Sequence, residues 1–432
     1  MSDMVDLGVR AGAAALAAGG VSALSLANIC LERIGNGRGR ALNAFIHVAA
    51  DTARAAAQAS DERRAAGRPL SALDGVPIAI KDNMDVFGMP TTNGLGASWM
   101  PAADAPVIRR LRDAGMVNLG KLNMHEAALG ATNDNPHYGR CEHPDFPGFT
   151  PGGSSGGSAV AVAAGLCPVS LGTDTMGSVR LPAAYCGIVG FKPSRGYWPV
   201  DGVMPLAFGL DTIGPLARSV GDIAFLLGEP LDAFAPATLR FARLANARQV
   251  ATEAECLAAL DAGLGVLATL GVAAPCLYVP GYDPGQARRA GFIVSEVDAA
   301  QVHARLLQTT PHAFSPLFRV MLDYGMRVAP ERYQAERRKL AAISTAFLGV
   351  FDACDVVLTL TAPQRAFSFD APVPLNQADL TALANFAGCP ALSLPLPVPA
   401  GALPVGLQLI AAPGRDTMLL SAGAWIESCF QA

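Results

Sequence analysis

The chain has 432 residues, of which 51% are apolar and 16% are charged, with a net charge of -4 and a pI near 5.9. This is the composition of a globular protein, and the mild acidity without a basic run argues against nucleic acid or an anionic membrane as the main partner. The nine cysteines show neither CxxC nor paired Cys/His spacing, so we expect no zinc site, no disulfide framework and a reducing cytoplasmic location.

The N-terminal part predicts helices. Residues 11–31 carry no charge, but Asp3 and Asp6 precede them and glycines interrupt them, which argues against an export signal or a membrane span. Residues 22–34 instead have the apolar spacing of a helix that Ser22 caps.

The rest of the chain alternates short apolar runs with amphipathic segments, which is typical of an α/β protein. Residues 76–80 (VPIAI) predict a buried strand, and Asp104 is expected to cap a helix with Pro106 in its first turn. Further strands are predicted at 116–120, 168–172, 356–360, 391–396 and 405–410, and helices at 157–165 and from Ser219 and Asp222 onward.

These elements predict one interleaved domain over residues 1–432, because the last three strands are expected to rejoin the sheet that begins at residue 76. The expected parts are N-terminal helices (1–70), a core (70–228), a mostly helical region (230–345) and a return to the sheet (350–432).

The stretch FTPGGSSGGSA, residues 149–159, places two serines between two glycine pairs. A flexible linker has such a composition, but this stretch lies between apolar elements and opens a helix, whereas linkers lie between domains. Glycine-rich turns before helices also expose N–H groups to phosphate, yet the GxxxxGK[ST] pattern is missing.

A third interpretation is a nucleophile elbow, because Gly153, Ser155 and Gly157 spell G-x-S-x-G. That motif expects a preceding strand and a later His. The residues before the motif do not predict a strand, and the downstream histidines are His303, within a helical pattern, and His312.

Lys81 offers a base other than histidine, since it directly follows the strand predicted at 76–80. A lone lysine at a strand end is commonly a surface residue. At the end of a buried strand, however, desolvation lowers the pKa of the amine and makes it usable as a general base.

The segment GTDTMGSVRLPAAYCGIVGFKPS, residues 172–194, bears on this choice. Together with Lys81 and the GGSSGGS loop it resembles the amidase signature family of hydrolases. The resemblance covers residues 70–228 almost continuously, with the runs DAPVIRRLRDAG and GKLNMHE, and resumes at NFAGCPALSLPL and LPVGLQLIAAP. Residues 230–345 match only loosely.

The resemblance implies an α/β fold with a central mixed β-sheet covered by helices on both faces, and a Ser-Ser-Lys triad. Ser178 falls on the family's nucleophile, Ser154 on its bridging serine with a cis peptide bond, and Lys81 on its base. Ser155 would hold the loop by hydrogen bonds. Ser-Lys arrangements are a known variant of nucleophile and base.

By the same resemblance, Asp174 and Arg180 pair and brace the loop of the nucleophile, and a substrate contact by Arg180 is the alternative. Met176 stands where most members have glycine, so its side chain either fills core or lines the pocket. The N–H groups of the oxyanion hole would come from four consecutive residues: Thr175, Met176, Gly177 and Ser178.

The expected function is hydrolysis of a small linear amide to a carboxylate and ammonia through an acyl-enzyme on Ser178, without metal or cofactor. The run NMHEAALGATNDNPHYG resembles the hydrolases of carboxybiuret and related ureides. One alternative is the glutaminase subunit of a tRNA-dependent amidotransferase, for which the C-terminal part looks short. The other is a non-catalytic binding protein on the same fold. A homo-oligomer and a small partner subunit both stay open.

Overall fold

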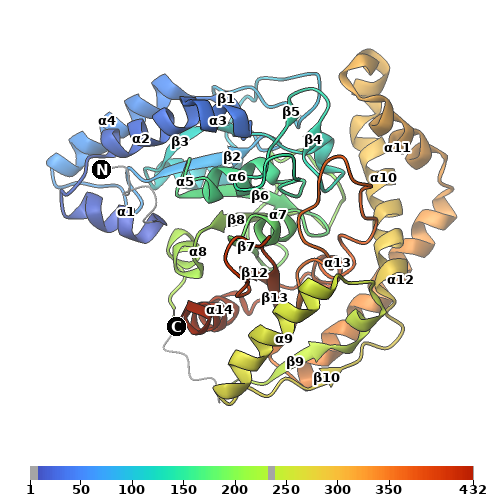
Figure 1. Ribbon diagram of the computed structural model, residues 1–432. Helices are drawn as coiled ribbons and strands as arrows, with labels where there is room; N and C mark the ends of the chain where they lie inside the picture. Colours follow the sequence, from blue (N-terminus) through green and yellow to red (C-terminus); the bar gives the residue numbers. More distant parts are fainter. Residues whose placement is uncertain (1–7, 232–238, 432) are drawn as a thin grey trace.

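The structure, a computed structural model, describes residues 8–231 and 239–431, so Asp3 and Asp6 lie outside the described residues. At its centre is a mixed sheet with the strand order β1-β3-β2-β6-β8-β7-β12-β13-β11-β9-β10 (Figure 1). The strands are β1 (Phe45–Val48), β2 (Pro77–Lys81), β3 (Val117–Leu122), β6 (Val169–Asp174), β7 (Val189–Lys192), β8 (Thr212–Ala217), β9 (Phe241–Leu244), β10 (Cys276–Leu277), β11 (Val356–Leu360), β12 (Ala391–Pro395) and β13 (Gly406–Ala411). Two further short strands, β4 (Asp134–Asn135) and β5 (Gly139–Arg140), pair with each other.

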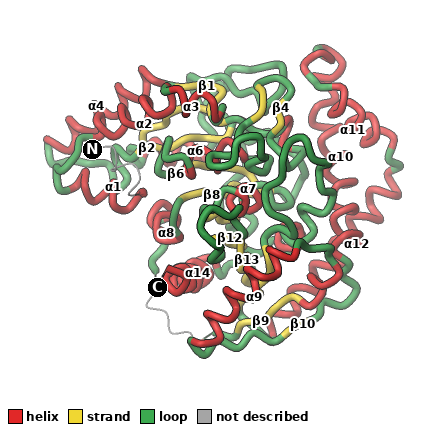
Figure 2. Tube along the Cα trace, in the orientation of Figure 1, coloured by secondary structure: helices red, strands yellow, loops and turns green. Residues whose placement is uncertain are grey.

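Helices surround this sheet, as the red segments around the yellow strands of Figure 2 show. They are α1 (Gly8–Ala17), α2 (Ala23–Gly35), α3 (Gly37–Leu42), α4 (Ala50–Ala65), α5 (Pro106–Asp113), α6 (Gly156–Ala163), α7 (Arg180–Tyr185), α8 (Val220–Leu227), α9 (Ala254–Thr269), α10 (Pro284–Thr309), α11 (Pro316–Arg327), α12 (Pro330–Leu348), α13 (Ala382–Phe386) and α14 (Asp416–Gln431). Among the described residues, none of these helices has the length and apolar content needed to cross a membrane.

Helices cover both faces of the sheet, which confirms the fold class expected from the sequence. Successive side chains of a strand point to opposite faces. On β12, the Leu392 side chain lies where a Cβ at Gly423 of α14 would be. The next residue, Ser393, lies beside Gly406, where a Cβ would also meet Ala184 of α7. Helices α14 and α7 therefore pack on opposite faces.

The strands predicted from apolar runs are all present, and the last three, β11, β12 and β13, join the same sheet as β2. Ser22 caps α2 by accepting the N–H of Ser25, as expected. The nine cysteines all lie within the described residues, and none of them forms a disulfide there.

The capping role predicted for Asp104 is wrong. Helix α5 begins at Pro106 without a side-chain cap. The Asp104 carboxylate instead accepts the N–H of Phe87 at 2.8 Å and pairs with Arg112 at 2.7 Å, so it ties two loops to the helix end.

The region predicted as mostly helical also contributes to the sheet. It contains α9, α10, α11 and α12, but also β9 and β10, which extend the sheet in parallel beside β11. Strands β9 and β10 are only four and two residues long, and Arg243 interrupts the apolar residues of β9, so the sequence could not separate them from helix. In Figure 1, α10, α11 and α12 form a layer at one side of the molecule.

Polar residues lie at the carboxyl ends of neighbouring strands of the sheet. Strands β2, β3 and β6 are mutually parallel, so their carboxyl ends lie at the same edge. Lys81 is the last residue of β2 and Asp174 is the last residue of β6.

Candidate active site

Lys81 reaches from the end of β2 into a buried group of hydroxyls. Its Nζ lies 2.7 Å from Ser154 Oγ, 2.9 Å from Ser155 Oγ and 2.8 Å from Thr173 Oγ1. Burial lowers the pKa of Lys81 from its ordinary value of 10.5 to about 7, although the charges of Asp174 and Asp211 act to raise it. A substantial fraction of the amine is therefore neutral at neutral pH.

The three hydroxyls around Lys81 differ in their other hydrogen bonds. Ser155 Oγ donates to the carbonyl oxygen of Thr173 at 3.2 Å, so toward Lys81 it acts as an acceptor. Thr173 Oγ1 already accepts an N–H of Asn83 at 3.0 Å. A neutral amine has two N–H donors and one lone pair. When neutral Lys81 donates its two N–H groups to Ser155 and Thr173, its lone pair is left to accept the proton of Ser154, 2.7 Å away.

The glycines around the two serines are needed for close packing. A Cβ at Gly153 would lie 2.9 Å from the backbone of Ala131, and one at Gly157 would lie 2.3 Å from the carbonyl oxygen of Asn123. The peptide bond between Gly153 and Ser154 is cis, as the resemblance implies. The GGSSGGS loop is thus a packed part of the core and not a linker.

Ser178 lies in the turn between β6 and α7 and is tied to this loop, because its carbonyl oxygen accepts the N–H of Ser155 at 3.2 Å. Lys81, Ser154 and Ser155 have no exposed surface. Ser178 is partly exposed, so it is the serine of this group that a substrate can reach.

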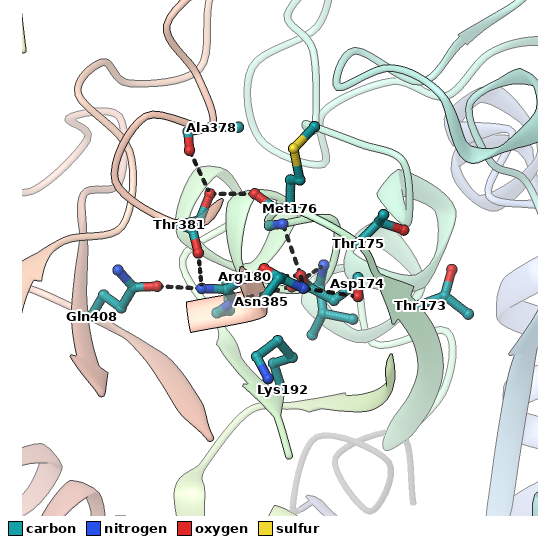
Figure 3. A network of polar contacts seen from close by, with 12 residues as sticks. Thr173, Asp174, Thr175, Met176, Arg180, Lys192, Ala378, Thr381, Asn385 and Gln408 are labelled. Atoms are coloured by element: carbon teal, nitrogen blue, oxygen red, sulfur yellow. Dashed lines mark hydrogen bonds and ion pairs between the residues drawn. The ribbon is translucent and has the colours of Figure 1, made fainter. Parts of the chain in front are cut away.

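The turn around Ser178 is held by a buried ion pair. Arg180 donates to both carboxylate oxygens of Asp174, at 3.0 and 2.9 Å. Burial alone would raise the pKa of Asp174, but the charge and hydrogen bonds of Arg180 hold it well below its ordinary range. Arg180 is itself fully buried, which fits the bracing role expected for it. Its further acceptors are Asn385 Oδ1, Gln408 Oε1 and the carbonyl oxygen of Thr381 (Figure 3).

The four residues predicted for the oxyanion hole follow directly after Asp174. The N–H of Gly177 donates to Asp174 Oδ1 at 2.7 Å, so this N–H also serves to hold the turn. The Thr175 hydroxyl donates to Asp211 Oδ1 at 2.6 Å. Their role as an oxyanion hole stays a prediction.

The Met176 side chain points away from the Asp174–Arg180 pair in Figure 3. It is 8% exposed, and a Cβ at Gly291 of α10 would lie 2.5 Å from its Sδ and 2.9 Å from Phe386. The sequence left open whether Met176 fills the core or lines the pocket, and this packing favours a place in the core.

The elbow interpretation does not fit the structure. Ser155 follows a loop and not a strand, and its hydroxyl is held by Lys81 and Thr173. His303 is buried in α10 against Phe314 and Phe318, where burial lowers its pKa to about 4, and His312 is exposed.

Several site residues were not found from the sequence. Asn83 and Thr173 orient Lys81, and His125 lies close by, with its backbone N–H bonded to the Ser154 carbonyl oxygen at 3.0 Å. Burial lowers the pKa of His125 to about 4, so its imidazole is neutral at pH 7. The sequence signal that could have pointed to His125 is its position in the GKLNMHE run, which is typical of the family. Within residues 8–231 and 239–431, no group of three or more His, Cys, Asp or Glu is placed to hold a metal ion.

Buried Lys81 bonded to Ser154, with the partly exposed Ser178 in the turn tied to the same loop, is the arrangement of a hydrolase of the Ser-Ser-Lys type. The family model described as Amidase matches residues 26–241 and 235–420. The chain therefore belongs to the amidase signature family.

Among curated proteins, the chain is similar to the A subunit of the glutamyl-tRNA(Gln) amidotransferase from Anaeromyxobacter sp. (strain K), at 36% identity over 98% of this chain and 96% of that protein. Its counterpart from Chloroflexus aurantiacus (strain ATCC 29366 / DSM 635 / J-10-fl) also matches at 36%, with the same coverage. The chain thus spans almost the whole length of these relatives. This coverage does not support the expectation that the C-terminal part is too short for such a protein.

Among solved structures, one described as an amidase matches with a TM-score of 0.91 and 32% identity over 98% of this chain and 100% of that one. Another comes from a protein complex that reveals the evolutionary origins of an s-triazine catabolic enzyme. It matches with a TM-score of 0.88 and 32% identity over 96% of both chains.

Proposed function

We propose that this amidohydrolase cleaves small linear amides to a carboxylate and ammonia through an acyl-enzyme on Ser178. The observation that carries the proposal is the buried contact of Lys81 with Ser154, whose Oγ lies 2.7 Å from the amine and can give its proton to the neutral form. A lysine is a usable base at neutral pH only when its pKa is depressed, and burial lowers that of Lys81 to about 7.

In the first half of the reaction, neutral Lys81 takes the proton of Ser154, and Ser154 takes that of Ser178 as its oxygen attacks the amide carbonyl. The C–O bond forms and the carbonyl becomes a tetrahedral oxyanion. The N–H groups of Thr175, Met176 and Ser178 then stabilise the negative charge, at roughly 3 kcal/mol for each well-placed donor, while that of Gly177 holds the turn through Asp174.

Collapse of this intermediate breaks the C–N bond. The proton returns from Lys81 through Ser154 to the leaving nitrogen, and ammonia departs. Water attacks the acyl-enzyme by the same relay in reverse, so that the carboxylate is released and Ser178 regains its proton.

A small acyl group is supported by the similarity to a solved amidase and to a protein linked with s-triazine catabolism, both at 32% identity. The ureide-like run NMHEAALGATNDNPHYG lies beside the site through His125. We therefore propose ureides and biuret-like compounds as the substrate class within the small amides.

A second candidate is the glutaminase subunit of a tRNA-dependent amidotransferase, which the 36% identity to such subunits favours. The two functions differ in the acyl group and in the need for partner chains. A glutaminase subunit is expected to need its partners for turnover, whereas the proposed amidase turns over its substrate without a tRNA-binding subunit.

Ammonia release by the purified chain tests the proposal, with malonamide, a biuret derivative, an aryl amide and glutamine as substrates. We expect turnover of at least one of the first two by the chain alone, and none by Ser178→Ala. Turnover of glutamine alone would support the glutaminase instead. No turnover of any amide, together with no labelling of Ser178 by a fluorophosphonate, would support the non-catalytic alternative.

A further inference from the structure

Asp211 lies beside the active site because of the register between β6 and β8. The two strands are antiparallel, and the last pair of the ladder is Asp174 with Thr212. One step further, Thr175 lies opposite Asp211, and the Thr175 hydroxyl donates to Asp211 Oδ1 at 2.6 Å. Asp211 therefore holds the residue that begins the predicted oxyanion hole.

The second carboxylate oxygen of Asp211 fixes the loop that leads to β8. It accepts the N–H groups of Leu206 at 2.8 Å and Ala207 at 3.1 Å. The same loop is tied to the segment after β2, where the N–H of Met204 donates to the carbonyl oxygen of Asn83 at 2.8 Å. Asp211 thus joins the turn of Ser178 to the segment that follows Lys81.

Two carboxylates act on the charge of Lys81, Asp174 and Asp211, and their own surroundings differ. Asp174 is paired with Arg180 and accepts from Asn385, so its charge is largely balanced. The hydrogen-bond donors to Asp211 among the described residues are one hydroxyl and two backbone N–H groups, and none of them is charged. His125, on whose pKa the charge of Lys81 also acts, is neutral at pH 7.

We propose that Asp211 is a positioning residue that fixes Thr175 and supplies the unbalanced negative charge that stabilises Lys81 when it carries the proton of Ser178. The inference rests on the proposed function, because it takes Lys81 as the base. Burial raises the pKa of Asp211 to about 6, so that the carboxylate is charged where the enzyme is expected to work.

Asp211→Asn removes this charge and keeps the shape of the side chain. The ammonium form of Lys81 then loses stabilisation, and the amine loses its proton at a lower pH. We expect the acid limb of the rate profile to move to lower pH by roughly 0.5–1 unit, because a nearby opposite charge favours the charged form. The plateau rate falls by about tenfold or more, because the base is weaker and the turn is less fixed.

The experiment measures the rate at which phenylmethanesulfonyl fluoride labels Ser178 between about pH 5.5 and 9, so that it needs no knowledge of the substrate. Asp201→Asn is the matched control, since Asp201 is exposed on the same loop and its replacement changes the net charge equally. Thr175→Val removes the hydroxyl but keeps the charge of Asp211, so it should lower the plateau and leave the acid limb in place.

An acid limb that stays in place in folded Asp211→Asn would overturn the inference, and so would an equal shift in Asp201→Asn. If Asp211→Asn does not fold, Asp211→Glu replaces it: the charge remains, and a shift of the limb by as much as one unit would contradict the account. Lys81→Met tests the proposed base separately from the role of Asp211. Wild-type labelling of that variant would refute Lys81 as the base, whereas its loss with an unshifted Asp211→Asn profile refutes only the role of Asp211.

Discussion

Lys81 and Lys121 end up in opposite situations although they lie on neighbouring parallel strands and neither has exposed surface. Ile80 pairs with Lys121 in the register of β2 and β3, so Lys81, one residue further, points to the other face of the sheet. Lys121 pairs with Asp82 at 2.8 Å, whereas the side-chain partners of Lys81 are three hydroxyls.

The difference shows what makes a buried lysine reactive. Burial lowers the pKa of both amines, but Asp82 counteracts this shift for Lys121 by charge and by hydrogen bond. A buried ion pair keeps an amine protonated, and a protonated amine has no lone pair for a proton. The hydroxyl partners of Lys81 satisfy its N–H groups and leave it free to act as a base.

The largest expected effect is a difference in kcat between variants of the two lysines. Lys81→Met should lower kcat by roughly three to four orders of magnitude, because it removes the activating base. Lys121→Met should leave the kcat of the folded enzyme within about threefold, since Lys121 lies on the other face. Ammonia release per active site checks this, and an active Lys81→Met would refute the assignment.

For folding stability we expect the opposite order, with the larger loss in Lys121→Met and the smaller loss in Lys81→Met. Lys121→Met leaves the buried Asp82 carboxylate without its counter-ion and should cost about 3–5 kcal/mol. Lys81→Met leaves only neutral hydroxyls, which lose about 1 kcal/mol for each hydrogen bond. Thermal unfolding of both proteins tests this. Equal melting temperatures would mean that the ion pair does not distinguish the two lysines.

A smaller effect is expected at Met176, which packs against Gly291. Gly291→Ala should destabilise the wild type, because its Cβ would lie 2.5 Å from Met176 Sδ. In the Met176→Ala background the same change should cost less, with a coupling of about 1 kcal/mol. The kcat/KM ratio of a large to a small amide should stay unchanged in Met176→Ala. A rise in that ratio would show that Met176 lines the pocket.

The smallest effect is expected for histidine and metal. His303→Gln should keep most of the activity, because His303 packs against Phe314 and Phe318, and His312→Ala should behave alike. Treatment with a chelator should not change the rate. Loss of turnover in either variant with normal melting would show that the Ser-Lys account is incomplete.

The sequence was sufficient for the strand that ends at Lys81, because an apolar run bounded by polar residues is a local signal. The resemblance to the amidase signature family was sufficient for the pair of Asp174 and Arg180. The four-residue β9 was missed, because short apolar runs inside helical surroundings carry no period of their own.

Contacts between distant parts of the chain were not predictable. Arg180 finds Thr381 and Gln408, which lie 201 and 228 residues later. Asp211 could be placed opposite Thr175 only once the antiparallel register of β6 and β8 was known. The sequence shows an acid before an apolar run, but neither its burial nor its partner Thr175 can be predicted from it.

The central claim, that Lys81 is a base whose pKa burial has lowered to about 7, can be measured directly. The chain has only four lysines, so lysine-selective isotope labelling gives four side-chain NMR signals. The signal that is absent in Lys81→Met should titrate near pH 7 in the wild type. Since protonated Lys81 cannot accept a proton, the labelling rate of Ser178 should rise with pH around the same midpoint. Titration of that signal near the ordinary 10.5, or a rise in labelling at another pH, would contradict the account.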